Sequence, residues 1–232
     1  MSYFMAENLE QNYEAVNIKV SFSCEKGTFT SIVGPSGSGK STVLRLICGL
    51  NKGSEQQKII LDGKDLNLVK PAEREIGMVF QSHSLFDHLT VADNVAYGLI
   101  SKGMKKKQAR QTAAAFIKQF ELEGFENRYP ETLSGGEAQR VSLARTLIMQ
   151  PKLVLFDEPL SALDAPLRKK LAILIKDLQK KFNFTGIMVT HDINEAKAIS
   201  NQIILMKKGK IYWQGNACDF TESMMTQDQK EL

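Results

Sequence analysis

Cysteine is scarce in this chain. Only 3 of the 232 residues are cysteine, and Cys24, Cys48 and Cys218 form no C-x-x-C pair. An odd and sparse set of thiols is typical of a protein kept in the reducing cytosol, and it gives no disulfide framework. Cys48 lies among apolar residues at helical spacing, so we interpret it as part of a core.

Long hydrophobic runs are missing as well. No charge-free apolar stretch approaches the ~20 residues that a membrane-spanning helix needs. The N-terminus, Met1-Ser2-Tyr3-Phe4, is followed by Glu7 and Glu10 and has no basic-then-apolar signal pattern. We therefore expect a soluble protein that reaches a membrane only through a partner.

A strong excess of one charge is also absent. The net charge is +4, with 43% hydrophobic and 24% charged residues, which is ordinary for a globular chain and does not indicate nucleic-acid binding. There is no internal repeat, low-complexity tract or obvious linker, so the length suits one large domain. The run Lys105-Lys106-Lys107, near Lys102, is interpreted as a solvated helix start, with contact to anionic lipid as the alternative.

The most informative feature that is present is a glycine-rich loop. Gly34-Pro35-Ser36-Gly37-Ser38-Gly39-Lys40-Ser41 fits G-x-x-x-x-G-K-[ST], the phosphate-binding loop of nucleotide hydrolases. An apolar strand precedes it at Phe29 to Val33, and apolar residues at helical spacing follow it: Val43, Leu44, Leu46, Ile47 and Leu50. Glycines let backbone N–H groups curl around phosphate oxygens, and the helix start adds its positive end. Taken alone, the motif also fits a glycine-rich turn before a core helix.

Two carboxylates follow another apolar strand. Asp157 comes directly after the run Leu153 to Phe156, and Glu158 comes next. A carboxylate at the end of a strand beside a phosphate loop is placed to hold Mg²⁺ with the Ser41 hydroxyl, while Lys40 reaches the β- and γ-phosphates. A second carboxylate there can polarise the attacking water. Without the loop, an ordinary acidic turn would be the simpler interpretation.

A third motif is the segment Leu133 to Arg140, which reads LSGGEAQR. Ser-Gly-Gly at the start of a helix offers a hydroxyl and backbone N–H groups to an anion. The alternative is a plain N-cap at Ser134, with Glu137 completing a capping box. The two interpretations overlap, because such a cap is also the device that binds phosphate.

Short apolar strands alternate with helices along the chain, which predicts an α/β fold. Lys58 to Leu61 reads as a strand, Ile187 to Val189 as a buried strand, and Ile203 to Met206 with Ile211 to Trp213 as a hairpin. Alternation of this kind implies a largely parallel sheet with helices on both faces. Residues from about 90 to 150 read mostly as helix and are expected to form an inserted subdomain.

Six motifs in this order resemble the ATPase subunit of an ATP-binding cassette (ABC) transporter. They are the loop Gly34–Ser41, Gln81, the signature Leu133–Glu137, the pair Asp157-Glu158, the segment Ser161–Asp164 and His191. The resemblance covers nearly the whole chain. It implies a phosphate-loop (P-loop) NTPase core of α/β class with a mostly parallel central sheet, an N-terminal antiparallel β part and an inserted α-helical subdomain. These would form a single domain, 1–232, with the core at 1–81 and 151–232 and the helical subdomain at 82–150.

The resemblance implies a role for each motif residue. The ATP-binding residues would be Tyr13, Gly34, Pro35, Ser36, Gly37, Ser38, Gly39, Lys40, Ser41 and Thr42. Glu158, His191 and Gln81 would be catalytic, and Ser41, Gln81 and Asp157 would hold Mg²⁺ as the cofactor. Tyr13 would stack on adenine. The spacing from Tyr13 to Gly34 is shorter than in many relatives, and Phe4 and Tyr3 are the alternatives.

Partners are also implied by the resemblance. The signature residues Ser134, Gly135, Gly136 and Glu137 would cap ATP held by a second copy, so that two ATP molecules bridge a head-to-tail homodimer with Asp164 at its seam. Integral-membrane subunits would carry the cargo, and an extracytoplasmic substrate-binding protein would act through the complex. The chain would lie peripherally on the cytoplasmic face of the inner membrane, without a nucleic-acid partner.

The segment after Gln81 resembles importer subunits. Residues 80–91, 94–99 and 158–164 are similar to those of the group that serves thiamine, ferric iron, polyamines, sugars and oxyanions. The chain ends soon after Gly215 without the extra C-terminal β-domain of many members, which favours thiamine as the cargo and ferric iron next. His83 and His88 have no further ligand at metal-binding spacing and are interpreted as loop residues.

Two alternatives stay open. Leu85, Phe86 and Leu89 either line a groove for a partner helix or belong to the core, because periodicity does not separate these cases.

An exporter or lipid-extraction ATPase is the alternative to an importer. A DNA-repair type ATPase would need a long coiled coil between residues 42 and 133, a translation-factor ATPase would need two cassettes, and a phosphate-loop kinase would lack the signature.

Overall fold

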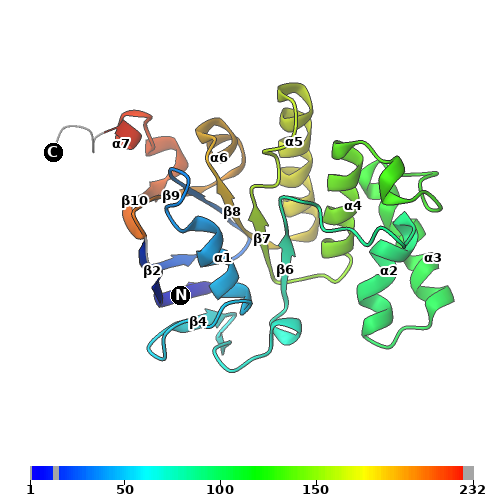
Figure 1. The fold of residues 1–232 in the computed structure, drawn as a ribbon, viewed down its shortest axis with the longest axis horizontal. Helices are drawn as coiled ribbons and strands as arrows, with labels where there is room; N and C mark the ends of the chain where they lie inside the picture. The colour runs from blue at the N-terminus through cyan, green and yellow to red at the C-terminus, as the bar shows by residue number, and fades with distance from the viewer. Residues whose placement is uncertain (1, 13–15, 227–232) are drawn as a thin grey trace.

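Two β-sheets with helices around them form the frame of the molecule (Figure 1). The computed structural model describes residues 2–12 and 16–226. The smaller sheet is antiparallel and has the strand order β2-β1-β4-β5. Its strands are β1 (Phe4–Asn12), β2 (Asn17–Cys24), β4 (Lys58–Leu61) and β5 (Lys64–Asp65).

The larger sheet has the strand order β10-β9-β3-β8-β7-β6. Its strands are β3 (Phe29–Val33), β6 (Ile76–Val79), β7 (Leu153–Asp157), β8 (Thr185–Thr190), β9 (Gln202–Lys207) and β10 (Lys210–Asn216). The pairs from β9 to β6 are parallel, and the β9–β10 hairpin is antiparallel. Every residue of β3, β7 and β8 is buried, which explains why these strands read as continuous apolar or small-residue runs.

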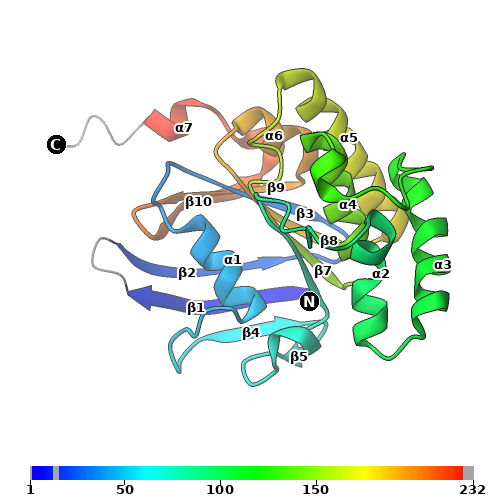
Figure 2. The same ribbon diagram turned by 45° about the vertical axis from the view of Figure 1, so that its right-hand side comes forward.

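Helices cover both faces of the larger sheet. They are α1 (Lys40–Cys48), α2 (Val91–Ser101), α3 (Lys106–Ile117), α4 (Gly135–Leu147), α5 (Ala165–Phe182), α6 (Ile193–Ile199) and the short α7 (Ser223–Thr226). Helix α1 lies between the two sheets, where residues from both sheets and the helix share one core (Figure 2). A second core joins α2, α3, α4 and α5 to the other face of the larger sheet. Across residues 2–12 and 16–226, no helix is long and apolar enough to cross a membrane.

The predicted α/β architecture is confirmed, with a mostly parallel central sheet, an antiparallel N-terminal part and the expected β9–β10 hairpin. Helices α2, α3 and α4 all fall between β6 and β7, where the helical subdomain was predicted, and the proposed boundaries stay a prediction. One detail was wrong. Leu50 does not continue the apolar face of α1, because Gly49 takes φ 79° and ends the helix, which leaves Leu50 56% exposed.

Candidate functional site

The glycine-rich loop joins the end of β3 to the start of α1. Gly39 is the N-cap of α1 with φ 95°, and Lys40 is the first residue of the helix. Gly34 is pressed against the neighbouring strand β9, since a Cβ there would lie 2.0 Å from the Met206 carbonyl oxygen. A side chain at position 34 would therefore force the loop off the sheet, which explains the need for glycine at this point.

The ammonium group of Lys40 is turned into the loop. Its Nζ donates to the carbonyl oxygens of Gly34 at 2.9 Å and Pro35 at 3.0 Å. Burial lowers the pKa of Lys40, and the carboxylates of Glu158 and Asp157 act in the opposite direction by favouring the charged form. The loop thus surrounds a cation beside the positive end of α1, which is a binding arrangement for a phosphate group.

A hydroxyl and a carboxylate meet at the edge of this loop. Ser41 Oγ donates to Asp157 Oδ1 at 2.6 Å, and Asp157 is buried at the end of β7. Oxygen ligands suit Mg²⁺, which usually keeps several waters and takes only one or two protein ligands beside phosphate. The pair fits Mg²⁺ in that mode, because a hydroxyl oxygen and a carboxylate oxygen meet beside the phosphate loop.

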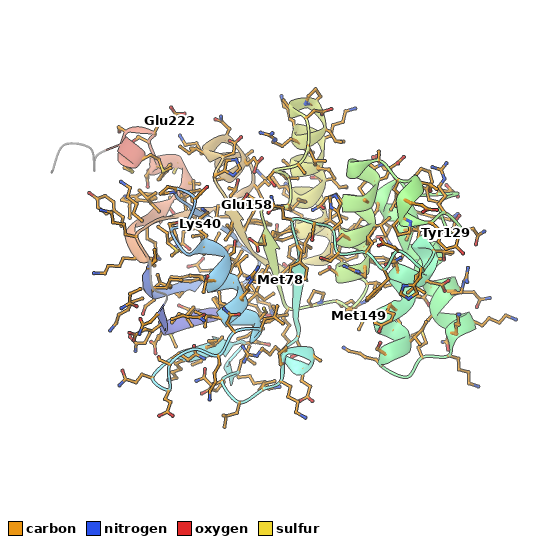
Figure 3. All side chains as sticks on the ribbon, in the orientation of Figure 1. Lys40, Met78, Tyr129, Met149, Glu158 and Glu222 are labelled. Carbon is orange, nitrogen blue, oxygen red and sulfur yellow. The ribbon has the colours of Figure 1, made fainter. Side chains whose placement is uncertain are left out.

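Glu158 and His191 are brought together by the neighbouring strands β7 and β8. The Glu158 backbone has φ 46°, and its N–H donates to the Val189 carbonyl oxygen at 3.0 Å. Glu158 Oε2 lies 3.4 Å from His191 Nδ1, and the Glu158 side chain is 23% exposed. The carboxylate extends from the end of β7 towards the region of Lys40 at the start of α1 (Figure 3). This places a proton acceptor, steadied by an imidazole, beside the phosphate loop.

Lys40, Ser41 and Glu158 line one cavity of about 350 Å³. Its lining consists of Val16, Ile18, Ser36, Gly37, Gly39, Lys40, Ser41, Thr42 and Glu158. The sequence did not single out Val16 and Ile18, although the alternation along β2 does place Ile18 on its buried side. A local sequence pattern does not predict which loop Ile18 lies against, because the two segments are distant in the sequence. Tyr13, the predicted adenine contact, lies outside the described residues.

Gln81 follows β6, and its side chain points to the turn after β7. Gln81 Nε2 donates to Ser161 Oγ at 3.1 Å, and Ser161 Oγ donates to the Glu158 carbonyl oxygen at 3.0 Å. Gln81 is therefore linked to the backbone of the predicted base through one serine. Its role as a ligand of Mg²⁺ stays a prediction.

The signature segment forms the start of α4. Ser134 is the N-cap, and the capping box is present: the Ser134 backbone N–H and hydroxyl donate to Glu137 Oε2 at 2.7 and 2.8 Å. These two hydrogen bonds from Ser134 lower the pKa of Glu137, so the side chain stays a carboxylate. Gly136 packs against α5, where an added Cβ would lie 2.6 Å from Leu167 Cδ2. Asp164 caps α5 by accepting from the Leu167 N–H at 2.9 Å.

The signature does not belong to the cavity around Lys40. Neither Ser134 nor the three residues after it line that cavity, and α4 lies beyond β6 and β7 from α1 (Figure 1). The starts of α1 and α4, both predicted to bind phosphate, are therefore apart within one chain.

The segment after Gln81 is neither simple core nor free loop. The buried Asn94 side chain accepts from the Phe86 N–H and donates to the carbonyl oxygens of Phe86 and Leu89. The half-buried Phe86 ring lies 4.6 Å from the Tyr97 ring and 5.5 Å from the Arg145 guanidinium carbon. Leu85 packs against the second core. The segment is thus fixed in shape while part of the Phe86 ring remains accessible.

His83 also has a fixed position. Its Nδ1 is hydrogen-bonded to Gln139 Oε1 of α4, and Arg145 donates to the carbonyl oxygens of His83 and Ser84. Both His83 and Ser84 have positive φ. The turn after Gln81 is therefore held by α4, the helix that begins with the signature.

Comparisons with known proteins agree with this geometry. A family model described as "ABC transporter" matches residues 18–161. The Fe(3+) ions import ATP-binding protein FbpC of Escherichia coli O157:H7 is 46% identical over 200 residues, which cover 86% of this chain and 57% of that protein. The protein of the same name from Agrobacterium fabrum is 44% identical over 211 residues, covering 90% and 60%. The chain thus spans somewhat over half the length of these curated relatives.

Solved structures are similar over almost the whole chain. A dimeric ATP-binding cassette in a post-hydrolysis state, bound to ADP and Pi, has a TM-score of 0.82 at 35% identity and covers 94% of this chain and 100% of its own. The cbiO1 protein from Clostridium perfringens, part of an ABC transporter complex, has a TM-score of 0.84 at 28% identity, covering 98% and 94%. The sequence similarity and the structural similarity thus lead to the same group of proteins.

A first prediction concerns Lys40 in the glycine-rich loop and Asp157 of the Ser41–Asp157 pair. Lys40→Ala removes the cation inside the loop, so we expect ATP hydrolysis to fall on the order of 100-fold and nucleotide binding to weaken. Asp157→Asn should also abolish the activity, so that added Mg²⁺ no longer changes the rate of hydrolysis. Phosphate release and binding of a fluorescent ATP analogue measure the two effects, with circular dichroism as the check on folding. A folded Lys40→Ala protein that turns over ATP at the wild-type rate would contradict the site.

Proposed function

This chain belongs to the ABC transporter family, and we propose that it is the ATP-hydrolysing subunit of a membrane importer whose cargo is ferric iron. The observation that carries the hydrolase part is that Glu158, which lies 3.4 Å from His191, lines the same cavity as Lys40 and Ser41. The importer part is supported by the relatives, whose names describe ferric iron import.

The residues divide the hydrolytic task among them. The loop N–H groups, the start of α1 and Lys40 bind the phosphates. When bound at Ser41 and Asp157, Mg²⁺ would neutralise phosphate charge and polarise the phosphoryl oxygens. Glu158 orients the attacking water and takes up its proton, and His191 fixes the Glu158 carboxylate in that role. Gln81, tied to Glu158 through Ser161, links the site to the segment that holds Phe86.

A head-to-tail dimer would complete the site. The phosphate loop and the start of α4 are apart in one chain, and each is an anion-binding helix start. A second copy would bring its Ser134 and Gly136 to the γ-phosphate held by Lys40, so that hydrolysis would remove the bridge between the copies. The dimeric cassette bound to ADP and Pi supports this arrangement.

Ferric iron replaces thiamine as the proposed cargo. Thiamine was favoured from the length of the chain, and the relatives reported above do not support it, since their names give Fe(3+) import. Ferric iron was the next expectation. Cargo selection would lie with the membrane subunits and an extracytoplasmic binding protein, while this chain would sit on the cytoplasmic face of the inner membrane.

A surface for the membrane subunit is offered where β6, α2 and α4 meet. A cavity of about 250 Å³ opens there, lined in part by Met78, Lys102, Arg145 and Met149. Met78 of β6 and Met149 after α4 lie at this junction (Figure 3). Arg145 also lies over the Phe86 ring, so one arginine adjoins both this cavity and the fixed segment after Gln81. Adaptable Met side chains beside a cation suit a short amphipathic helix of a membrane partner.

The cargo makes a second prediction. In cells that lack this chain, we expect uptake of radiolabelled ferric iron to fall, to return with the wild-type chain, and to stay low with Lys40→Ala. Thiamine uptake, measured in the same cells, should not change. If thiamine uptake fell and iron uptake did not, ferric iron would be the wrong cargo, although the ATPase assignment would stand.

The junction of β6, α2 and α4 makes a third prediction. Phe86→Ala removes the half-buried ring but none of the phosphate contacts, so ATP binding should stay within about twofold while coupled transport falls about tenfold. Transport and ATPase rates in the reconstituted complex measure the two effects separately. Tyr212→Ala is the matched control, because Tyr212 is a 52% exposed aromatic on the distant strand β10. Unchanged transport in Phe86→Ala would argue against a partner surface here.

The divided site makes a fourth prediction. Glu158→Gln keeps the shape of the side chain and removes the charge that activates water, so ATP should bind without being hydrolysed. The variant should accumulate as a dimer with ATP and be mainly monomeric without it, as seen by size-exclusion chromatography with light scattering. Adding Ser134→Arg places a bulky cation at the start of α4 and should prevent the dimer without emptying the phosphate loop. An ATP-bound Glu158→Gln protein that stays monomeric at high concentration, alone and with its membrane subunits, contradicts the two-copy site.

A further inference from the structure

Arg168, near the start of α5, donates hydrogen bonds to two acceptors and lies within ion-pair distance of a third, in two different turns. Its Nη2 donates to the Leu163 carbonyl oxygen at 3.0 Å, in the turn between β7 and α5. Its Nη1 lies 3.2 Å from Asp192 Oδ2, and its Nε lies 3.4 Å from Glu195 Oε1, both in or after the turn between β8 and α6. One planar guanidinium therefore connects the two turns, as its fixed fork of donors allows.

The turn between β8 and α6 contains His191. The residue before it, Thr190, donates from Oγ1 to Glu195 Oε2 at 2.7 Å and accepts from the Asp192 N–H at 3.0 Å. Asp192, the residue after it, is the N-cap of α6. Both neighbours of His191 are thus fixed through the groups that Arg168 contacts, whereas the imidazole is 58% exposed and reaches Glu158.

The turn between β7 and α5 contains Glu158. Ser161 Oγ donates to the Glu158 carbonyl oxygen, and three residues along the chain Asp164 caps α5. Between them, Leu163 gives its carbonyl oxygen to Arg168 and its side chain to the signature, lying 3.6 Å from where a Cβ of Gly135 would stand. The course of this turn is therefore fixed at its end by Arg168.

The charge balance of the cluster also depends on Arg168. Glu195 is only 7% exposed, and burial raises its pKa, while the Thr190 hydroxyl and Arg168 favour its charged form. Asp192 carries a second negative charge nearby and acts in the same direction as burial. Without the guanidinium, the Asp192 and Glu195 carboxylates would lose the one cation of α5 that pairs with both of them, so the turn that carries His191 would be held less firmly.

We propose that Arg168 is a positioning residue for ATP hydrolysis: by joining the β7–α5 turn to the β8–α6 turn, it sets the distance between Glu158 and His191. The role rests on the proposed hydrolase function, because it acts on the geometry of the base and not on substrate binding. Arg168 does not line the cavity around Lys40, so its effect should appear in turnover and not in nucleotide affinity.

Three variants of α5 test this role in the ATPase assay. Arg168→Gln should lower kcat at least tenfold, while the dissociation constant of a fluorescent ATP analogue stays within twofold. Arg168→Lys should fall between wild type and Arg168→Gln, because an ammonium keeps the charge but does not span all three acceptors. Lys169→Gln is the matched control, since it removes the same charge from the next, exposed residue, and should keep the wild-type rate. Equal kcat in Arg168→Gln and wild type overturns the proposal.

A double-mutant cycle separates positioning from general loss of stability. If Arg168 acts through His191, then Arg168→Gln should slow the His191→Ala enzyme by less than twofold. A full additional tenfold loss in that background would show that Arg168 acts by another route and would overturn the proposal. The nucleotide dissociation constant of each variant checks that the site remains folded.

Amide hydrogen exchange tests the connection without relying on hydrolysis. In Arg168→Gln, the amides of residues 161–165 and 190–195 should both exchange faster, while those of β3 and α1 stay protected. Faster exchange in both turns supports the connection, and unchanged exchange in either turn overturns it. A wild-type protein that does not hydrolyse ATP would instead refute the proposed function, so the two failures are distinguishable.

Discussion

The site depends on one constraint, the shared register of three parallel strands. In the larger sheet β3, β8 and β7 are neighbours, with Val33 paired to Thr190 and Asp157 paired to Val189. Because parallel strands end at the same edge of a sheet, the loops that follow them must meet there. The phosphate loop lies more than 100 residues before the carboxylates and the imidazole in the chain, and all of these groups still meet at one edge. The distances between the side chains of the site therefore depend on the positions of these strand ends.

Local motifs were sufficient to predict the parts that lie within single loops. The lysine of the glycine-rich loop and the carboxylates Asp157 and Glu158 come at the ends of short buried strands, so their place on the sheet edge could be predicted, while their chemical roles stay a prediction. The fold class followed from the same alternation. Contacts between loops could not be read in this way. That Gln81 meets Ser161, or that Arg168 meets Asp192, depends on strand order and turn shape, which sequence spacing does not encode.

Other features lay beyond the sequence for different reasons. For Phe86, the sequence left two alternatives open, a partner groove and the core. Periodicity distinguishes buried residues from exposed ones, but it does not identify a half-buried ring that is held by Asn94 and Tyr97. Thiamine was inferred from the length of the chain, which contains no information on the chemistry of the cargo.

The division of the site between two cores also could not be predicted from the sequence. The phosphate loop adjoins the core around α1, and the signature adjoins the core of α2 to α5. Leu163 in the turn before α5 and Leu167 of α5 lie next to the signature glycines. Such a division is visible only when both cores are assembled.

The capping box at the start of α4 turns anion binding there into an exchange. The helix end already has an anion, the Glu137 carboxylate, which occupies both the N–H and the hydroxyl of Ser134. In the proposed dimer, a phosphate at this helix start would compete with the carboxylate for the same two donors, so only the difference between the two interactions would contribute to affinity. The displaced carboxylate would stay nearby, because Glu137 belongs to the same helix turn. An anion that binds these donors weakly would therefore gain little affinity at this helix start.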